Sequence, residues 1–515
     1  MKKLKKLMAL LLSVVMILAM GVTVFAATPA TSGSLKINVK DGGSLMGQKI
    51  YIFKLMDLTE TDPADYNVNS TYEETLKTVL SIGEVEDVDY AVYSALAAHT
   101  NLQQFANDFT SAVLAGGSIT GTASTDYYIS GGISGASTYT FTDVAPGYYL
   151  VYLGGSQTIQ SSLVTVNGAA ATEAGKINEV NLKSETPTPE KEANVTSVNI
   201  GDVVTYTVKF TIPDITGYDT NSYVFTLKDT LSDGLDFVKS ATDKTVVNSG
   251  SLSVSVQVGS AAASDMNATI TGRNMTLDLS DVVTANQNPK NQEVTVTYYA
   301  QVNENAVFNN TSNSARLEYS NDPATTETGD SVPDVVKTPT FDIKVHKYEK
   351  GKDTEYLAGA VFELHRESED GTIVKMSEES VTGYYTVAKN QEEASVTELK
   401  TAGAQISTTG ANLQINGLKA GVYYLVEKET PGNAYNLAAP VKIEIVDKTA
   451  GADEVSYKIK VNDGAEADIA KIENSRGTIL PGTGGMGTVI FTVAGLVLIL
   501  GVGASFVISR KRNAA

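Results

Sequence analysis

The 515-residue sequence has no cysteine and no tryptophan, and only three histidines, His99, His346 and His365. Without cysteine the chain has no disulfides, no thiolate zinc site and no cysteine nucleophile. The histidines do not follow a metal-ligand spacing, so we expect no metal and no cofactor. Walker loops, helix–loop–helix calcium loops and Gly-x-Ser-x-Gly elbows are missing as well. Together these absences argue against an enzyme.

Basic residues are also scarce, with 39 Lys and Arg against 59 Asp and Glu, for a net charge of −20. Removing the four lysines near the N-terminus and the three basic residues 510–512 from this total leaves −27 for the segment between. Such a surface stays soluble and repels nucleic acid. Hydrophobic residues make up 42% of the chain, enough for real cores, and the length predicts two to four domains at about 100–200 residues each.

The N-terminus has the pattern of an export signal. Four lysines within residues 2–6 are followed by an apolar stretch over 7–18 and by the small-residue site Val24-Phe25-Ala26. This order is typical of a secretory signal peptide over residues 1–26, cleaved between Ala26 and Ala27. We therefore expect the rest of the chain to be exported.

The C-terminus has the pattern of a membrane anchor. Residues 489–508 are apolar apart from Thr492 and Ser505, and about 20 such residues suffice for a transmembrane helix. The basic tail at 509–515 is expected to remain in the cytoplasm. The sequence thus predicts export that stops with the C-terminus held in the membrane.

Two proline-containing segments without strand alternation, 184–190 and 331–340, have the character of linkers. They divide the exported part into a first domain (27–183), a middle domain (184–337) and a third domain (338–476).

The exported segments show the period of β-strands. In the stretch DVVTYTVKFTIP, alternate residues are apolar and are expected on one face: Val204, Tyr206, Val208, Phe210 and Ile212. Short alternating strands separated by Gly, Asn and Asp turns predict a mainly β fold of antiparallel sandwiches. Only the first domain adds a helical stripe, which we expect to pack into its core: Leu102, Phe105, Ala106, Phe109, Ala112 and Val113.

A weak internal repeat links the first and third domains. LMGQKIYIFKL at 45–55 is similar to LAGAVFELH at 357–365, and PGYYLVYLGG at 146–155 is similar to AGVYYLVEKE at 420–429. The two domains are therefore expected to share one strand plan.

Within that repeat, Glu427 is the residue most open to a chemical role. If Leu425 faces the core, alternation places Tyr423 and Glu427 on the same face. A carboxyl group buried there would have its pKa raised and could stay protonated. The alternative is an edge residue paired with a lysine, and alternation alone does not separate the two.

Several motifs of the third domain resemble the terminal domain of sortase-assembled pilins of Gram-positive bacteria. These are LAGA with its following strand, Tyr-x-Leu-x-Glu ending at Glu427, and IENSRG before LPGTGG. The resemblance implies an immunoglobulin-like sandwich of the collagen-adhesin B type. It also implies an intramolecular isopeptide between Lys347 of the first strand and Asn474 of the last, with Glu427 as the proton shuttle.

The chemistry of such a bond is physically reasonable. A lysine that is desolvated is neutral and nucleophilic. A protonated carboxyl can polarise the asparagine amide and transfer protons as ammonia leaves.

The middle domain resembles the A-type member of the same family. The resemblance places Lys191 at the first-strand lysine, Asp229 at the acid and Asn313 at the acceptor. Other asparagines lie close to Asn313 in sequence, namely Asn309, Asn310 and Asn321, so the acceptor is left open among them. The alternative for Lys191 is an exposed lysine of the linker.

The first domain departs from this pattern. Where the third domain has Tyr-Leu-Val-Glu, the first has Tyr149-Leu150-Val151-Tyr152. Lys40 could serve as a nucleophile, but Tyr152 cannot shuttle protons as a carboxyl does. We predict no internal crosslink of this kind there.

The pentapeptide Leu480-Pro481-Gly482-Thr483-Gly484, followed by the apolar run and the basic tail, resembles the sorting signal of sortase substrates. The resemblance implies that a sortase cysteine attacks the Thr483 carbonyl and releases the chain from Gly484 onward. The resulting thioester would pass to peptidoglycan in an anchored monomer, or to a lysine of the next subunit in a pilus shaft.

The lysine at the corresponding position is Lys183, although Asn181-Leu182-Lys183-Ser184 replaces the family's aromatic-Pro-Lys-Asn form. We therefore expect a backbone pilin on the bacterial surface, stiffened by internal bonds. Its expected partners are sortases, copies of itself, minor pilins and peptidoglycan. The alternatives are a wall-anchored monomeric adhesin or minor pilin, and a cell-wall enzyme, for which no triad or metal constellation is found. An exposed strand-end lysine is the alternative for Lys183.

Overall fold

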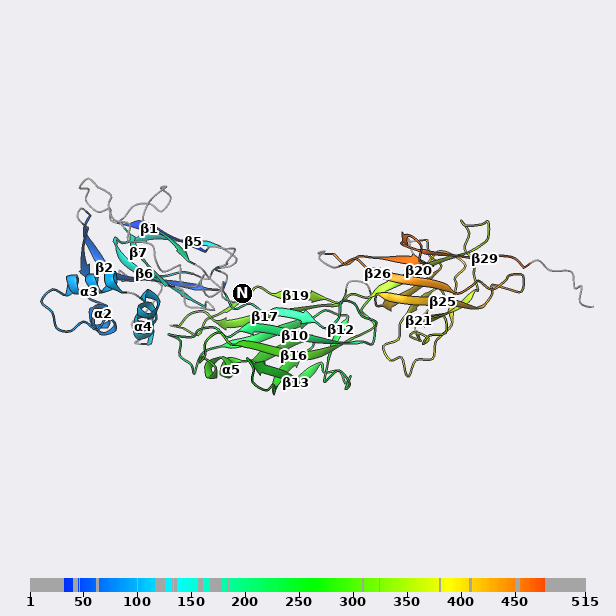
Figure 1. Ribbon diagram of the computed structural model, residues 1–515, viewed down its shortest axis with the longest axis horizontal. Helices are drawn as coiled ribbons and strands as arrows, with labels where there is room; N and C mark the ends of the chain where they lie inside the picture. The colour runs from blue at the N-terminus through cyan, green and yellow to red at the C-terminus, as the bar shows by residue number, and fades with distance from the viewer. Residues whose placement is uncertain are drawn as a thin grey trace, which may run out of the picture. The chain divides into compact units, whose positions relative to one another are not determined.

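The computed structural model describes residues 32–477 except for short gaps at 40–44, 46, 62–63, 100, 116–125, 132, 134–136, 156–160, 167–177, 183–185, 308–309, 324, 379–380, 407–409 and 450–453. Over these residues the chain is mainly β, as the sequence predicts (Figure 1). No helix in this part of the chain is long and apolar enough to cross a membrane. The predicted signal peptide, the sorting pentapeptide, the apolar run and the basic tail lie outside the described residues.

Contacts divide the chain into two compact units. The first comprises Met1–Thr196 with Asp202–Pro339, and the second comprises Ser197–Gly201 with Thr340–Ala515. The five residues of the short segment belong to the second unit because they bond to it. Ile200 N donates to Gly417 O at 3.0 Å, and Tyr423 Oη donates to Asn199 Oδ1 at 3.2 Å. The first unit holds the segments predicted as the first and middle domains apart from residues 197–201, and no sheet of the described residues joins the two segments.

The first domain places two sheets against each other and helices against one of them. One sheet has the order β5-β1-β8, and the other β3-β2-β6-β7 with β4 beside β2. The strands are β1 (Gly33–Val39), β2 (Lys49–Thr61), β3 (Ala64–Val68), β4 (Tyr127–Ile129), β5 (Thr138–Val144), β6 (Gly147–Gly154), β7 (Ser161–Val166) and β8 (Glu179–Leu182). Between β3 and β4 lie α2 (Glu73–Val79), α3 (Val88–Ala98) and α4 (Leu102–Ala115).

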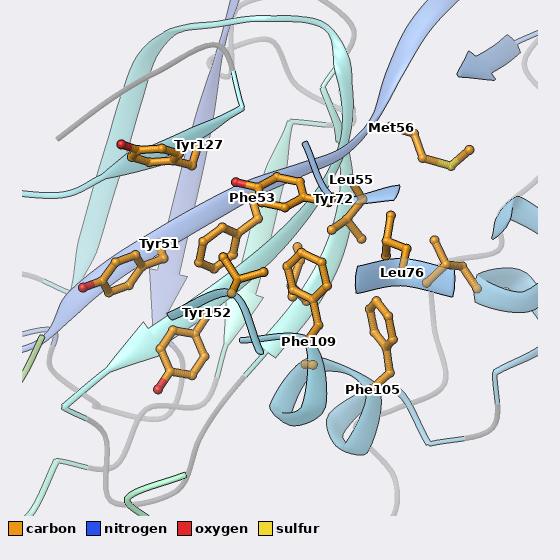
Figure 2. Close-up of a cluster of buried hydrophobic side chains, with 14 of the residues drawn as sticks. Tyr51, Phe53, Leu55, Met56, Tyr72, Leu76, Phe105, Phe109, Tyr127 and Tyr152 are labelled. Carbon is orange, nitrogen blue, oxygen red and sulfur yellow. The ribbon is translucent and has the colours of Figure 1, made fainter. Parts of the chain in front are cut away.

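Alternation along β2 and β6 supplies a core to each side of their sheet. Ile50, Ile52, Val151 and Leu153 face the sheet that contains β1. The residues that alternate with them, such as Tyr51, Phe53 and Tyr152, pack in the core cluster with the helices (Figure 2). Because successive side chains of a strand point to opposite faces, a stretch buried on both sides is apolar, as residues 50–53 of β2 and 149–153 of β6 are.

The helical stripe predicted over residues 102–113 is confirmed in α4. Phe105, Ala106, Phe109 and Val113 are buried, whereas Ala112 is exposed. The ring centroid of Phe109 lies 5.8 Å from that of Phe53 and 5.4 Å from that of Tyr72, both in edge-to-face contact. These contacts join α4 to β2 and to the segment before α2 (Figure 2).

Phe109→Ala should therefore lower the free energy of unfolding of the first domain by about 3–5 kcal/mol, because the cavity it leaves is lined by rigid rings. Urea unfolding followed by hydrogen exchange of α4 would measure the loss. Asp108→Ala is the matched control, since Asp108 is exposed on the same helix and should change stability by less than about 0.5 kcal/mol. Equal effects of the two substitutions would contradict this packing.

The middle domain is one 11-stranded sheet system that connects through β18-β17-β11-β15-β14-β13-β16-β10-β9, with β12 beside β16 and β19 beside β17. Its elements are β9 (Glu190–Ala193), β10 (Val203–Thr211), β11 (Phe225–Leu231), β12 (Leu235–Val238), β13 (Ser249–Val258), β14 (Ser264–Thr271), β15 (Asn274–Asp278), α5 (Ser280–Ala285), β16 (Glu293–Val302), β17 (Ser312–Ser320), β18 (Thr328–Asp330) and β19 (Asp334–Lys337). The alternation predicted for β10 is confirmed, because Val204, Tyr206, Val208 and Phe210 are all buried.

The third domain has two sheets, ordered β22-β24-β20-β29 and β23-β21-β25-β26-β27-β28. Its strands are β20 (Phe341–Glu349), β21 (Val361–Arg366), β22 (Tyr384–Thr386), β23 (Leu399–Lys400), β24 (Leu413–Leu418), β25 (Gly421–Glu429), β26 (Val441–Asp447), β27 (Tyr457–Val461), β28 (Glu466–Ala467) and β29 (Ala470–Asn474).

The strand plan shared by the first and third domains is confirmed. In each, the first strand pairs in parallel with the last, β1 with β8 and β20 with β29. In each, the two repeated segments pair with each other in antiparallel fashion, β2 with β6 and β21 with β25. The first domain differs mainly in the helices inserted after β3.

Candidate cross-linking sites

In the middle domain, the structure brings Lys191, Asp229 and Asn313 together on three separate strands. Lys191 lies on β9, Asp229 on β11 and Asn313 near the start of β17, and all three are buried. Antiparallel pairing of β11 with β17 sets Asp229 opposite Ala315 and brings Asn313 to the same end of the sheet. Lys191 is thus not the exposed linker lysine of the alternative interpretation.

The contacts within this triad are short. Lys191 Nζ lies 2.5 Å from Asp229 Oδ2. Asp229 Oδ2 also accepts a hydrogen bond of 2.5 Å from the hydroxyl of Tyr298, which in turn contacts Lys191 Nζ. The amide nitrogen of Asn313 donates to the same hydroxyl at 3.2 Å. Tyr298 therefore touches all three members of the triad.

Burial shifts the ionisation of this site toward its neutral form. It lowers the pKa of the Lys191 amine, and the attraction of Asp229 only partly opposes this. It also raises the pKa of Asp229, again against the effect of the neighbouring lysine. Both shifts weaken the preference for the ion pair and bring the neutral pair, a free amine beside a carboxylic acid, closer to it in free energy.

The other asparagines near the middle-domain site do not make these contacts. Asn310 donates its amide to Asn305 O at 3.0 Å, and Asn309 lies outside the described residues. Asn321 lies at the far end of β17, after Ser320. The contacts of the site therefore favour Asn313 as the acceptor.

In the third domain, the structure brings Lys347, Glu427 and Asn474 together. Their exposed fractions are 0%, 4% and 1%, so none of the three is an edge residue. Lys347 lies on β20 and Asn474 ends the neighbouring β29, while Glu427 reaches them from β25 in the other sheet. The alternation predicted for β25 is confirmed, since Tyr423 and Leu425 are buried on the same face.

Glu427 lies between the other two members of this triad. Its Oε1 atom is 3.4 Å from Lys347 Nζ, and its Oε2 atom accepts a 2.9 Å hydrogen bond from Asn474 Nδ2. The same nitrogen of Asn474 donates to Asn436 O at 2.7 Å, which fixes the orientation of the amide. Burial lowers the pKa of Lys347 to about 8.

Both triads contain buried polar atoms without a hydrogen bond to any described residue. In the middle domain these are Asp229 Oδ1 and Asn313 Oδ1, and in the third domain Lys347 Nζ, Glu427 Oε1 and Asn474 Oδ1. An unsatisfied buried polar atom costs about 1–3 kcal/mol, so such groups gather where they have a chemical use. An amine, an acid and an amide held together in a dry site are the reactants for amide exchange with loss of ammonia.

Each triad connects strands far apart in sequence. In the third domain the parallel register sets Lys347 opposite Ile472 and Glu349 opposite Asn474, so a Lys347–Asn474 bond would join its first and last strands. Lys191 and Asn313 likewise lie on β9 and β17, which are separated by seven other strands in the chain.

The sequence alignment that made Tyr152 the counterpart of Glu427 is wrong by one residue. Glu427 pairs with Phe362 on β21, and the residue of β6 in the same register is Leu153, which pairs with Ile50 on β2. Tyr152 faces the helices instead. A shift of one residue along a strand moves a side chain to the opposite face.

The described core-facing residues of β1 are apolar as well, namely Leu35, Ile37 and Val39. Lys40 lies outside the described residues. The absence of an internal crosslink from the first domain remains a prediction.

Two more predicted site residues lie outside the described part of the chain, Lys183 and Thr483 with its pentapeptide. Lys183 directly follows β8. Within the described residues no group of three or more His, Asp or Glu side chains is arranged to hold a metal ion.

Sequence reasoning missed Tyr298. Alternation in VTVTYYA shows that Tyr298 is a core residue, but it gives no sign that the residue lies beside Lys191. That contact depends on the pairing of β10 with β16, which sets Tyr206 opposite Tyr298, and of β10 with β9. The rings of both tyrosines lie 4.9 Å from Lys191 Nζ.

Residues 341–460, which include β20 to most of β27, match the family described as the SpaA prealbumin-like fold domain. The matched segment covers the third domain from β20 into β27 and leaves out β28 and β29. No curated protein sequence gives a significant match to the chain.

Solved structures similar to the chain include three described as backbone or major pilins. The T6 backbone pilin of Streptococcus pyogenes is 14% identical, with a TM-score of 0.43, over 87% of this chain and 99% of that one. SpaD of Corynebacterium diphtheriae is 18% identical, with a TM-score of 0.41, over 87% and 98%. SpaA of the same organism is 16% identical, with a TM-score of 0.39, over 86% and 100%.

Proposed function

We propose that this protein is the structural backbone subunit of a covalent pilus on the bacterial surface. The observation that carries the proposal is the pair of buried triads, Lys191–Asp229–Asn313 and Lys347–Glu427–Asn474, in a chain without cysteine. The sorting pentapeptide ahead of an apolar run, and the match of residues 341–460 to the SpaA prealbumin-like fold domain, support the same conclusion. The chain is then a substrate of sortase and a self-crosslinker that reacts once at each site, rather than a turnover enzyme.

Each internal bond forms by the same exchange. The neutral lysine amine attacks the side-chain carbonyl carbon of asparagine, and the acid donates a proton to the oxygen. The attacking nitrogen loses a proton, the asparagine nitrogen gains one and leaves as ammonia, and the acid recovers its proton as the carbonyl reforms. Asp229 has this role in the middle domain and Glu427 in the third.

The location of these bonds suits a protein under tension. In the third domain, force enters at the start of β20 and leaves after β29, the two strands that Lys347 and Asn474 occupy. A covalent bond between them carries that force past the rest of the domain, which therefore has no need to unfold. In an exported chain without cysteine, this chemistry takes the place of disulfides.

Polymerisation is proposed to join Thr483 of one subunit to Lys183 of the next. A sortase thiolate attacks the Thr483 carbonyl, the Thr483–Gly484 bond breaks, and the departing amine takes a proton. The Lys183 amine then attacks the thioester, the thiolate leaves, and the nitrogen loses a proton to give the amide. Lys183 suits this reaction because it directly follows β8, the strand that ends the first domain.

Lys183→Ala should collapse a ladder of high-mass species to monomer on a boiled SDS gel of cell-wall extracts probed for this protein. The reason is that boiling does not break amide bonds, so only covalent polymers survive as a ladder. Lys191→Ala is a matched control, because it removes a lysine eight residues away that is assigned to an internal bond, and its ladder should persist.

Other outcomes of the gel are equally informative. A ladder that survives Lys183→Ala means that another lysine makes the link between subunits. A single wall-released band in the unmodified strain would mean a monomeric anchored adhesin, and the shaft proposal would be wrong.

A further inference from the structure

The hydroxyl group of Tyr298 has all its hydrogen-bonding positions occupied by members of the middle-domain triad. It donates to Asp229 Oδ2 at 2.5 Å and accepts from Lys191 Nζ and, at 3.2 Å, from Asn313 Nδ2. One donor and two acceptor positions are all that a phenol has. Tyr298 itself is almost completely buried, with 1% of its surface exposed, so water does not compete for these positions.

We propose that Tyr298 is a catalytic residue of the middle domain, and that its hydroxyl relays a proton from the attacking nitrogen of Lys191 to the departing nitrogen of Asn313. This inference rests on the proposed internal bond between these two residues. It assigns to the site a third reacting group in addition to the acid.

The relay balances as follows. When Lys191 Nζ bonds to the side-chain carbon of Asn313, the nitrogen becomes positively charged, and Asp229 protonates the oxygen. Nζ then gives one proton to the Tyr298 oxygen, while the original hydroxyl proton passes to Asn313 Nδ2. The carbon–Nδ2 bond breaks, ammonia leaves, and Asp229 takes back its proton as the carbonyl reforms. Tyr298 and Asp229 end unchanged.

The need to move a proton between Lys191 Nζ and Asn313 Nδ2 explains why a hydroxyl group is useful in this site. A proton must leave one nitrogen and reach the other within a site that holds little water, and a group that both accepts and donates can do this in one step. Tyr298 keeps its proton until it is needed, because burial raises the pKa of its phenol well above the usual value. It therefore acts as a neutral relay and not as a phenolate base.

The neighbouring Tyr206 provides a contrast within the same site. Its ring lies at the same 4.9 Å distance from Lys191 Nζ as that of Tyr298. Its hydroxyl, however, lies 3.5 Å from the Thr338 hydroxyl and not among the reacting groups. The two rings can thus contribute equally to burying the lysine, whereas only the Tyr298 hydroxyl is placed to move a proton.

The third domain shows a different solution. The ring near Lys347 Nζ is that of Phe362, at 5.4 Å, which has no hydroxyl. Glu427, which is one methylene longer than Asp229, contacts both Lys347 and Asn474 through its two oxygens. The third-domain bond therefore serves as an internal reference that should not depend on a tyrosine hydroxyl.

The test measures the rate of each internal bond in the full-length chain, produced in a Gram-positive host that lacks sortase. A pulse of isotopically labelled lysine is followed by acid quenching, digestion and mass spectrometry of the linear and crosslinked peptides. Tyr298→Phe should slow formation of the Lys191–Asn313 peptide by at least about tenfold, in line with the effect of losing a proton-transfer group. Tyr206→Phe should leave that rate unchanged, and both variants should form the Lys347–Asn474 peptide at the unmodified rate.

The outcomes separate this inference from the proposed function. If the unmodified chain contains no crosslinked Lys191–Asn313 peptide, both the proposed bond and the proton relay that depends on it are wrong. If the bond forms and Tyr298→Phe matches Tyr206→Phe in rate, only the relay is wrong. Conversely, a slow middle-domain bond in Tyr298→Phe alone supports the relay.

A second measurement covers the case in which Tyr298→Phe lowers the protease resistance of the newly made middle domain. Incorporating 3-fluorotyrosine throughout the chain makes every phenol a better proton donor and a weaker proton acceptor without removing its hydroxyl. The relay then predicts a changed rate of formation for the middle-domain bond, with no change in the third domain. A tyrosine that only packs against Lys191 would give equal rates with and without fluorine, and that result would overturn the proposal.

Discussion

Replacing Glu427 with alanine should reduce the number of ammonia losses in the mature ectodomain from two to one. Each bond formed by lysine attack on asparagine releases one ammonia, so each lowers the mass by about 17 Da relative to the sequence. Glu427 is the only acid that contacts both Lys347 and Asn474 among the described hydrogen bonds and ion pairs. Without it, no group in the described site can carry the protons that the exchange requires.

The third domain should also become less stable when the Lys347–Asn474 bond is lost. The bond closes a loop from residue 347 to residue 474, and chain entropy alone assigns about 5 kcal/mol to closing a loop of roughly this length. Urea unfolding or trypsin digestion of the ectodomain would show this loss. Because the middle domain has its own triad, its resistance to both treatments should be unchanged.

Matched variants make this result specific. Glu429→Ala lies on the same strand but is exposed, so it should retain both ammonia losses. Glu427→Gln keeps the shape of the side chain but has no proton to give, so it should lose one bond as Glu427→Ala does. Two ammonia losses in Glu427→Ala would show that Glu427 is not the proton carrier. An unmodified chain without any ammonia loss would contradict both proposed bonds.

The second large effect is expected from pH. Burial lowers the pKa of Lys347 to about 8. The Lys347–Glu427 pair therefore holds one proton below pH 8 and loses this proton above pH 8. The exchange needs a free amine for the attack and a protonated acid for the oxygen, which together amount to one proton on the pair. The rate of bond formation should therefore hold up to about pH 8 and then fall about tenfold for each further pH unit.

This pH profile can be measured on ectodomain that is isolated unfolded, before its internal bonds have formed, and then diluted from denaturant into buffers between pH 7 and pH 10. Samples are quenched in acid, and the Lys347–Asn474 peptide is quantified over time, with tyrosine fluorescence recording folding separately. A rate that rises through pH 8 would instead mean that the free amine alone limits the reaction, and that the acid is not required. A fall that parallels slower folding would count against the assignment to this pair.

Patterns among residues that are close together in the sequence account for much of what could be predicted. Alternation placed Val204, Tyr206 and Val208 on the buried face of β10. It also set Tyr423, Leu425 and Glu427 on one face of β25, which the structure shows to be the buried face. The similarity of two segment pairs predicted the common strand plan of the first and third domains, which β2–β6 and β21–β25 confirm. These features depend on residues a few positions apart, whose side chains the backbone geometry alone directs.

The same local reasoning failed where the answer depended on register. Matching the letters Tyr-Leu-Val in the two domains paired Tyr152 with Glu427, yet the strand pairing shows that Leu153 is the counterpart. Letter similarity does not distinguish the two faces of a strand that is apolar on both, and β6 is such a strand. Only the partners across the sheet decide which face is which.

The sequence by itself indicated the mainly β fold and the alternation within its strands, and it excluded thiol chemistry because the chain has no cysteine. Tertiary structure alone decided that Lys191 and Lys347 are desolvated, which acid and amide each one meets, and that Tyr298 lies among the reacting groups. The physical reason is that composition and periodicity are local properties. Burial and contact between β9, β11, β16 and β17 arise only when strands distant in the chain pack around one core.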